Sequence, residues 1–135
     1  MSYPITAIGG VDEEAAARLK SVGIRSTERL LETARTLRGR KNLADKTGFD
    51  EKQLLCWANV ADRMRIKGIS RDYAALLQVA GVDTVKELKY RNPANLAQAM
   101  AEANKKNKLV RLLPSEKVVA RWIEDAKKLP LKITY

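Results

Sequence analysis

The sequence predicts an all-α protein, and three observations lead to this fold class. Apolar residues recur at helical spacing, capping residues precede these stretches, and alternating apolar and polar runs of useful length are missing. The chain has 135 residues, of which 45% are hydrophobic, enough for one compact domain. We therefore expect short helices joined by loops of about two to six residues.

Four or five helices are predicted in each half, and the first half carries signals for four. The first runs between a cap at Asp12 and a stop at Gly23, and the second begins after Ser26. Gly39 and Gly48 bracket a short helix around Leu43. The next helix carries an apolar stripe at i, i+3, i+7 and i+10, formed by Leu54, Trp57, Ala61 and Met64. This stripe predicts that the helix is committed to the core.

The second half shows similar signals. Ser70 can cap a helix that ends at Gly81, and a capping box begins at Thr84. Pro93 opens a helix through about Ala103. The last helix begins after Ser115, and its stripe is Val119, Trp122, Ala126 and Leu129. Both tryptophans are thus predicted to be core anchors rather than platforms for stacking bases.

The second half repeats the first. At a shift of 58, residues 8–30 align with residues 66–88, and a shift of 65 aligns Trp57 with Trp122, so the second copy holds an insertion of seven residues. The identical pairs at the shorter shift are Ile8 and Ile66, Gly10 and Gly68, Ala16 and Ala74, Ala17 and Ala75, Leu19 and Leu77, Gly23 and Gly81, and Leu30 and Leu88. We predict two units, 1–65 and 66–135, that share one core.

Each unit starts with the pattern apolar-x-Gly-apolar-x-x-x-x-Ala-x-x-Leu, at residues 8–19 and 66–77. Glycine allows a tight turn, and the helix after it presents free N–H groups that can hold a phosphate. This pattern resembles the helix-hairpin-helix motif, in which a second glycine follows the apolar residue. Here that glycine is replaced by Asp12 in the first copy and by Ser70 in the second.

The whole chain from about Ile8 to Tyr135 is similar to a bacterial domain-of-unknown-function family of tandem helix-hairpin-helix proteins. The segments that carry the resemblance are GVDEEAAARLKSVGI, LADKTGF, RIKGISRDYAALLQVAGVDTVKEL, NPANLAQAM, LVRLLPSEK and the final Ile-Thr-Tyr. The resemblance implies two helix-hairpin-helix units packed as a SAM-like helical bundle. It also implies DNA binding, by analogy with other proteins that carry the motif.

Charge favours a polyanionic partner. The net charge is +10, from 26 Lys and Arg against 16 Asp and Glu. Residues 1–65 hold twelve basic and nine acidic side chains, a net charge of +3, whereas residues 66–135 hold fourteen and seven, a net charge of +7. In the first hairpin, Asp12 and its two glutamate neighbours would repel a phosphate, whereas cations flank the second. The second hairpin is therefore the predicted site.

We predict non-enzymatic, sequence-independent binding of double-stranded DNA through this second hairpin, with structured RNA as another possible ligand. The predicted binding residues are Arg65, Lys67, Gly68, Ile69, Ser70 and Arg71, with Gly9 and Gly10 of the first hairpin. Secondary basic patches are predicted at Arg38, Arg40, Lys41, Lys105, Lys106 and Lys108. The alternative is a protein-interaction scaffold for an acidic partner, in which the hairpins are purely structural. Co-purification with and without nuclease would separate the two hypotheses.

Other functions have weaker support in the sequence. Nucleophile–base pairs, phosphate loops and zinc patterns are missing, and histidine is absent, so we predict no enzyme, metal or cofactor. The single cysteine, Cys56, lies in an apolar segment and is expected to be buried. A helix-turn-helix around Gly48 is a rival motif. Its recognition helix would enter the DNA groove with the acidic residues Asp50 and Glu51 first, which is unfavourable beside phosphates. The first residues lack the basic and apolar regions of a signal peptide, and no long apolar run is present. The sequence therefore favours a cytoplasmic protein that does not enter a membrane.

Overall fold

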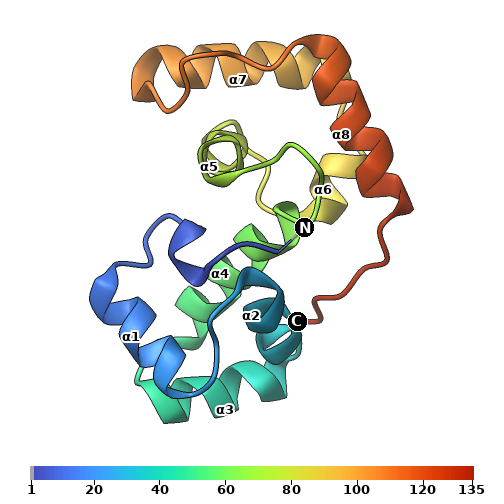
Figure 1. The fold of residues 1–135 in the computed structure, drawn as a ribbon. Helices are drawn as coiled ribbons and strands as arrows, with labels where there is room; N and C mark the ends of the chain where they lie inside the picture. The colour runs from blue at the N-terminus through green and yellow to red at the C-terminus, as the bar shows by residue number, and fades with distance from the viewer. Residues whose placement is uncertain (1) are drawn as a thin grey trace.

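The fold is all-α in a computed structural model that describes residues 2–135 (Figure 1). These residues form eight α-helices and one short 3-10 helix, with no named β-strand. The elements in chain order are η1 (Ile5–Ala7), α1 (Glu13–Ser21), α2 (Thr27–Ala34), α3 (Leu37–Thr47), α4 (Glu51–Arg63), α5 (Arg71–Val79), α6 (Val85–Lys89), α7 (Pro93–Asn107) and α8 (Glu116–Lys128). The predicted fold class is confirmed.

The predicted caps begin most of the helices. The Asp12 carboxylate accepts the amide of Ala15 at 2.8 Å, and Thr84 forms a full capping box with Glu87. Ser26, Asn92 and Ser115 each accept an amide three residues ahead. The exception is the predicted cap at Ser70: its side chain accepts no capping hydrogen bond from the described residues.

Two predicted helix boundaries are wrong. Gly39 lies inside α3, which starts after a cap at Thr36. A Cβ atom at position 39 would lie 2.1 Å from the carbonyl oxygen of Thr33, so glycine serves the close approach of α2 and α3 rather than a helix end. The helix that begins at Pro93 continues past the predicted end at about Ala103, as far as Asn107. It ends there without a glycine, because Lys108 takes the left-handed conformation with φ +47°.

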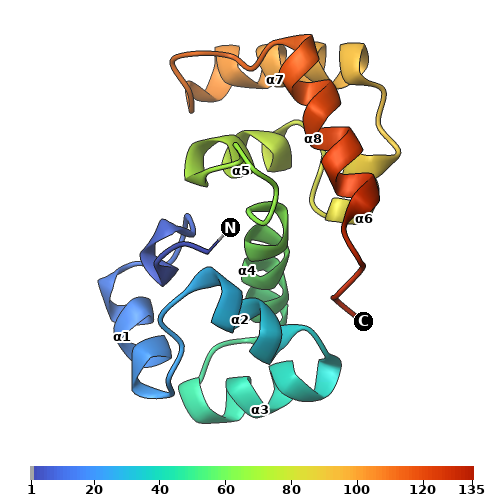
Figure 2. The same cartoon turned by 45° about the vertical axis from the view of Figure 1, so that its right-hand side comes forward.

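Helix α4 lies between the two halves of the molecule (Figure 2). In the first half α2 and α3 pack against α4, and in the second half α6 and α7 pack against α8. Helix α5 lies beside α7 and touches α4. As a result α3 and α7 stand at opposite ends of the molecule in both views (Figures 1 and 2).

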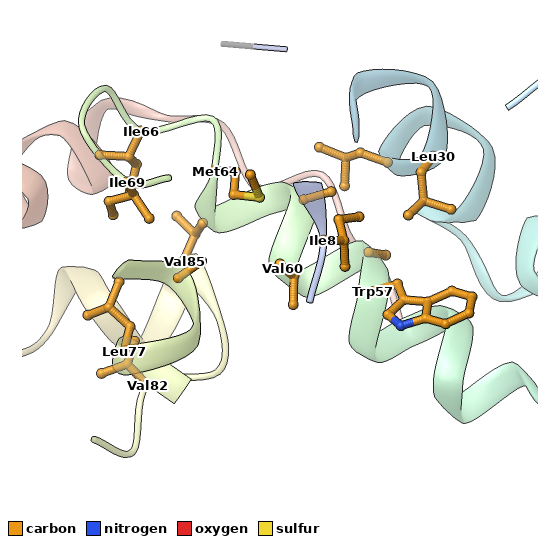
Figure 3. Close-up of a cluster of buried hydrophobic side chains, with 14 of the residues drawn as sticks. Ile8, Leu30, Trp57, Val60, Met64, Ile66, Ile69, Leu77, Val82 and Val85 are labelled. Carbon is orange, nitrogen blue, oxygen red and sulfur yellow. The ribbon is translucent and has the colours of Figure 1, made fainter. Parts of the chain in front are cut away.

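One hydrophobic cluster runs through both halves. Figure 3 shows Val60 of α4 and Met64, the residue after its end, between residues of the two halves, while Trp57 of α4 lies on the side of the first half. The labelled residues on either side are Ile8 and Leu30 of the first half, and Ile66, Ile69, Leu77, Val82 and Val85 of the second. The two tryptophans are buried, which confirms their predicted place in the core. The predicted burial of Cys56 is wrong: it is exposed, because it lies about 100° of helix rotation from the buried Trp57.

The C-terminal tail, residues 129–135, returns from α8 to the first half (Figure 1). Its Thr134 amide donates to the carbonyl of Arg35 at 2.7 Å, and the Lys132 ammonium pairs with Glu32 at 2.5 Å. The guanidinium of Arg40 donates to the Thr134 carbonyl at 2.7 Å. The tail therefore ties the end of the second half to α2 and α3.

Candidate functional site

The two glycine loops that open the halves share one backbone geometry. Gly10 has φ +94° and Gly68 has φ +92°, values that favour glycine. In each loop the amide after the glycine donates to the carbonyl three residues earlier, at 3.1 Å in both. In each following helix the first intrahelical bond is 2.8 Å long. The sequence match between residues 8–16 and 66–74 thus extends to their hydrogen bonds.

A tryptophan lies behind each glycine. A Cβ atom built on Gly10 would lie 3.6 Å from the indole Nε1 of Trp57, and one built on Gly68 would lie 3.1 Å from the indole Nε1 of Trp122. The second loop is therefore packed more closely on its tryptophan than the first. This contact gives both loops a structural role that is independent of any ligand.

The start of α1 is already occupied by acidic side chains. The Asp12 carboxylate takes the N–H group of Ala15, and Glu14 pairs with Arg18 at 2.8 Å. A negative charge at this end of a helix stabilises it by interacting with the helix dipole. The same charge repels an incoming anion, so the first loop is a poor phosphate site.

The start of α5 is open to solvent. Ser70 is exposed, and so are Arg71 and Lys67 on either side of it. In front of it lies a hollow of about 600 Å³. Its lining consists of Ser70, Asp72, Tyr73, Lys108, Leu109, Val110, Arg111 and Leu112. We call this site the α5 hollow.

The far wall of the α5 hollow is the loop after α7. The Asn104 carboxamide oxygen accepts the amides of Leu109 and Val110 at 2.8 and 3.0 Å, and its nitrogen donates to the Val110 carbonyl. The Tyr73 hydroxyl donates to the Leu112 carbonyl at 2.7 Å, while its ring lies against Trp122. These contacts fix the loop to α5 and hold Lys108 and Arg111 at the edge of the hollow.

The insertion in the second half supplies this wall. Helix α7 has 15 residues where its counterpart α3 has 11. The loop after α7 spans 108–115, whereas the loop after α3 spans 48–50. The sequence predicted an insertion in the second copy and a basic patch at Lys105, Lys106 and Lys108, but it did not place either of them beside Ser70. No local signal carries that information, since the packing of α7 on α5 decides it.

Two predicted surface arginines belong to the interior. Arg40 is 2% exposed and donates to the carbonyls of Ala34 and Thr134, so it is not part of a surface patch. The side chain of Arg65 is 15% exposed and is held by the Asp62 carboxylate and the Pro130 carbonyl. Burial raises the pKa of Asp62, and the positive charge of Arg65 opposes that shift.

The remaining predicted residues are scattered. Arg38 and Lys41 are exposed on α3, at the far end of the molecule from α7 (Figure 2). Lys105 and Lys106 are exposed near the end of α7, next to the wall of the α5 hollow. Ile69 is fully buried. Gly9 is exposed in the first loop. The predicted basic patches on α3 and α7 therefore do not share one face.

The second helix of the rival helix-turn-helix motif, α4, is largely buried. Helix α4 follows a turn at Gly48, as a helix-turn-helix would require, but its core residues fill the interface between the halves. Across residues 2–135, no group of three or more Cys, Asp or Glu is placed to hold a metal ion. The described helices are all too short or too polar to cross a membrane.

Comparison with known proteins gives one family. The sequence profile of a family described as a domain of unknown function (DUF4332) matches residues 9–129, and the chain belongs to this family. No curated protein and no solved structure matches the chain.

Proposed function

We propose that this member of the DUF4332 family is a non-enzymatic helix-hairpin-helix protein that binds double-stranded DNA without sequence preference. The observation that carries the proposal is the open start of α5, which faces a cationic loop across the α5 hollow. The excess of positive charge in the same half supports it.

A DNA phosphate in the α5 hollow would accept hydrogen bonds from the backbone at the start of α5 and from the Ser70 hydroxyl. Helix starts bind anions because their first N–H groups have no partner within the helix and their dipole ends are positive. Lys108 and Arg111 line the hollow and add two positive charges, against one opposing carboxylate at Asp72. Lys67 and Arg71 are exposed on either side of Ser70 and add two more outside the hollow. The balance of charge at the site therefore favours an anion.

Such contacts set the expected affinity. With about four phosphates neutralised, the logarithm of the binding constant should fall with the logarithm of salt concentration at a slope of about −3 to −4. We expect a dissociation constant in the micromolar range at physiological salt, because sequence-independent contacts dominate. Duplexes of different sequence and equal length should bind with similar affinity.

The test is fluorescence anisotropy with a labelled duplex at about 50 mM salt, where such complexes are tight. The double variant Lys108→Glu with Arg111→Glu should lose at least about tenfold in affinity. The matched control, Arg25→Glu with Arg29→Glu, makes the same change of charge on exposed residues of the first half. It should lose much less.

Two results would contradict the proposal. One is the absence of binding by the wild-type protein at this salt concentration. The other is an equal loss in both double variants, which would mean that total charge rather than the α5 hollow governs binding. Competition with unlabelled RNA duplex, measured in the same assay, tells whether the site distinguishes DNA from structured RNA.

A protein-interaction scaffold is the second candidate, and one feature favours it. Leu37 and Tyr135 are exposed beside a hollow of about 350 Å³ at the junction of α3, α4 and the tail. Apolar side chains around a hollow are typical of a site for another protein. Partners recovered with the protein after nuclease treatment would support the scaffold, whereas their loss would support DNA binding.

A further inference from the structure

A leucine at the mouth of the α5 hollow is unusually exposed. Leu112 is 77% exposed, the largest fraction among the large apolar side chains of the described chain. It lines the same hollow as Ser70, so it lies next to the proposed phosphate position. Leu113 follows it and is also exposed.

The segment that presents Leu112 is fixed rather than loose. Its own carbonyl accepts the Tyr73 hydroxyl at 2.7 Å, and the Asn104 side chain bonds to both residues 109 and 110. A loop held in this way exposes an apolar side chain at a defined position. The exposure is therefore built into the fold.

The charge around Leu112 indicates what could cover it. Lys108 and Arg111 lie on the same loop and line the hollow with Leu112, where they outnumber the one carboxylate, Asp72. An apolar protein surface would have to desolvate these cations, at a large cost. A nucleic acid offers phosphates for the cations and the faces of base pairs for the leucine.

We propose that Leu112 is a wedge that enters the minor groove and partly unstacks one base step next to the phosphate held in the α5 hollow. Proteins that bend DNA insert apolar side chains in this way and kink the duplex by roughly 20 to 90°. The inference rests on the proposed DNA binding and adds to it that the bound duplex is kinked, while its affinity still depends little on sequence. Within a bound duplex, steps such as TA, which unstack easily, are where the leucine would enter.

The test uses a duplex that carries 2-aminopurine at a central TA step. Its fluorescence rises when the base loses its stacking partner. At saturating protein the wild type should raise the signal severalfold, and Leu112→Ala should leave it close to that of the free duplex. Anisotropy on the same samples should show affinity within about threefold of the wild type, because phosphate contacts supply most of the binding energy.

The matched control is Leu131→Ala, which removes the same atoms from a side chain that is 56% exposed in the tail. It should keep the full fluorescence signal. Circular dichroism melts of both variants confirm that they are folded.

The outcomes separate the wedge from the proposed function. Binding by the wild type without a fluorescence rise, or an equal rise with Leu112→Ala, would overturn the wedge and leave DNA binding intact. Failure of the wild type to bind the duplex by anisotropy would overturn both.

Discussion

The two glycine loops of this protein have the same backbone and opposite electrostatics. Both turn through a glycine at φ near +93° and pack that glycine against a buried tryptophan. In the first loop Asp12 bonds to the helix start, whereas in the second Ser70 leaves the helix start open beside a cationic wall. The comparison teaches that one backbone geometry can carry different charge at the helix start, and that the residue at the cap makes the difference.

The largest expected effect concerns the glycines. Gly68→Ala should lower the free energy of unfolding by about 2 to 3 kcal/mol, because it combines left-handed strain with a contact of 3.1 Å to Trp122. Gly10→Ala adds the same strain with a contact of 3.6 Å, so it should cost only about 1 to 2 kcal/mol. Urea denaturation measures both. Equal losses would mean that the closer packing of the second loop has no energetic weight.

The next effect is an exchange of the two cap residues. Ser70→Asp gives the second loop the carboxylate of the first, and it should weaken DNA binding by about tenfold through repulsion of the phosphate. Its stability should be equal to or above that of the wild type, because aspartate is a good cap. Anisotropy and thermal melts on the same samples separate the two effects.

The reverse exchange, Asp12→Ser, serves as the control for this experiment. It removes a negative charge from the first loop but leaves Glu13 and Glu14 in place. We expect little gain in DNA affinity. A gain as large as the loss with Ser70→Asp would mean that the first loop binds DNA as well.

The smallest effect is on capping itself. Asp12→Ala should lower the free energy of unfolding by about 1 kcal/mol, since it removes a capping bond of 2.8 Å. Ser70→Ala should cost only a few tenths of a kcal/mol, because the described structure shows no capping bond at Ser70. A loss of about 1 kcal/mol with Ser70→Ala, measured by urea denaturation, would show that Ser70 caps α5 in solution.

Much of the fold could be predicted because its signals are local. Capping residues mark where helices begin, and apolar stripes such as that of Trp57 and its helical neighbours mark which face is buried. The errors also have local causes. Gly39 has the appearance of a helix end but serves a close contact with Thr33, and Lys108 ends α7 without the glycine that usually signals a stop.

The candidate site could be predicted only in part. Ser70, Arg71 and Lys67 are neighbours in the chain, so the sequence predicted them as one site. Arg65 has the same charge, but its side chain is turned toward Asp62 and the tail. A residue's type shows its charge, whereas its packing decides whether that charge reaches solvent.

By itself, the sequence determined the helical class, the repeat and the difference in charge between the two loops, because these depend on residue types and on spacings within a few turns. Tertiary structure alone decided that Arg40 is buried beneath the tail and that Lys108 and Arg111 stand across a hollow from Ser70. Those pairings join residues about 40 to 95 positions apart in the chain. The hollow forms because α5 and α8 both pack on α7, whereas Arg40 is covered because the tail returns from α8 to α3.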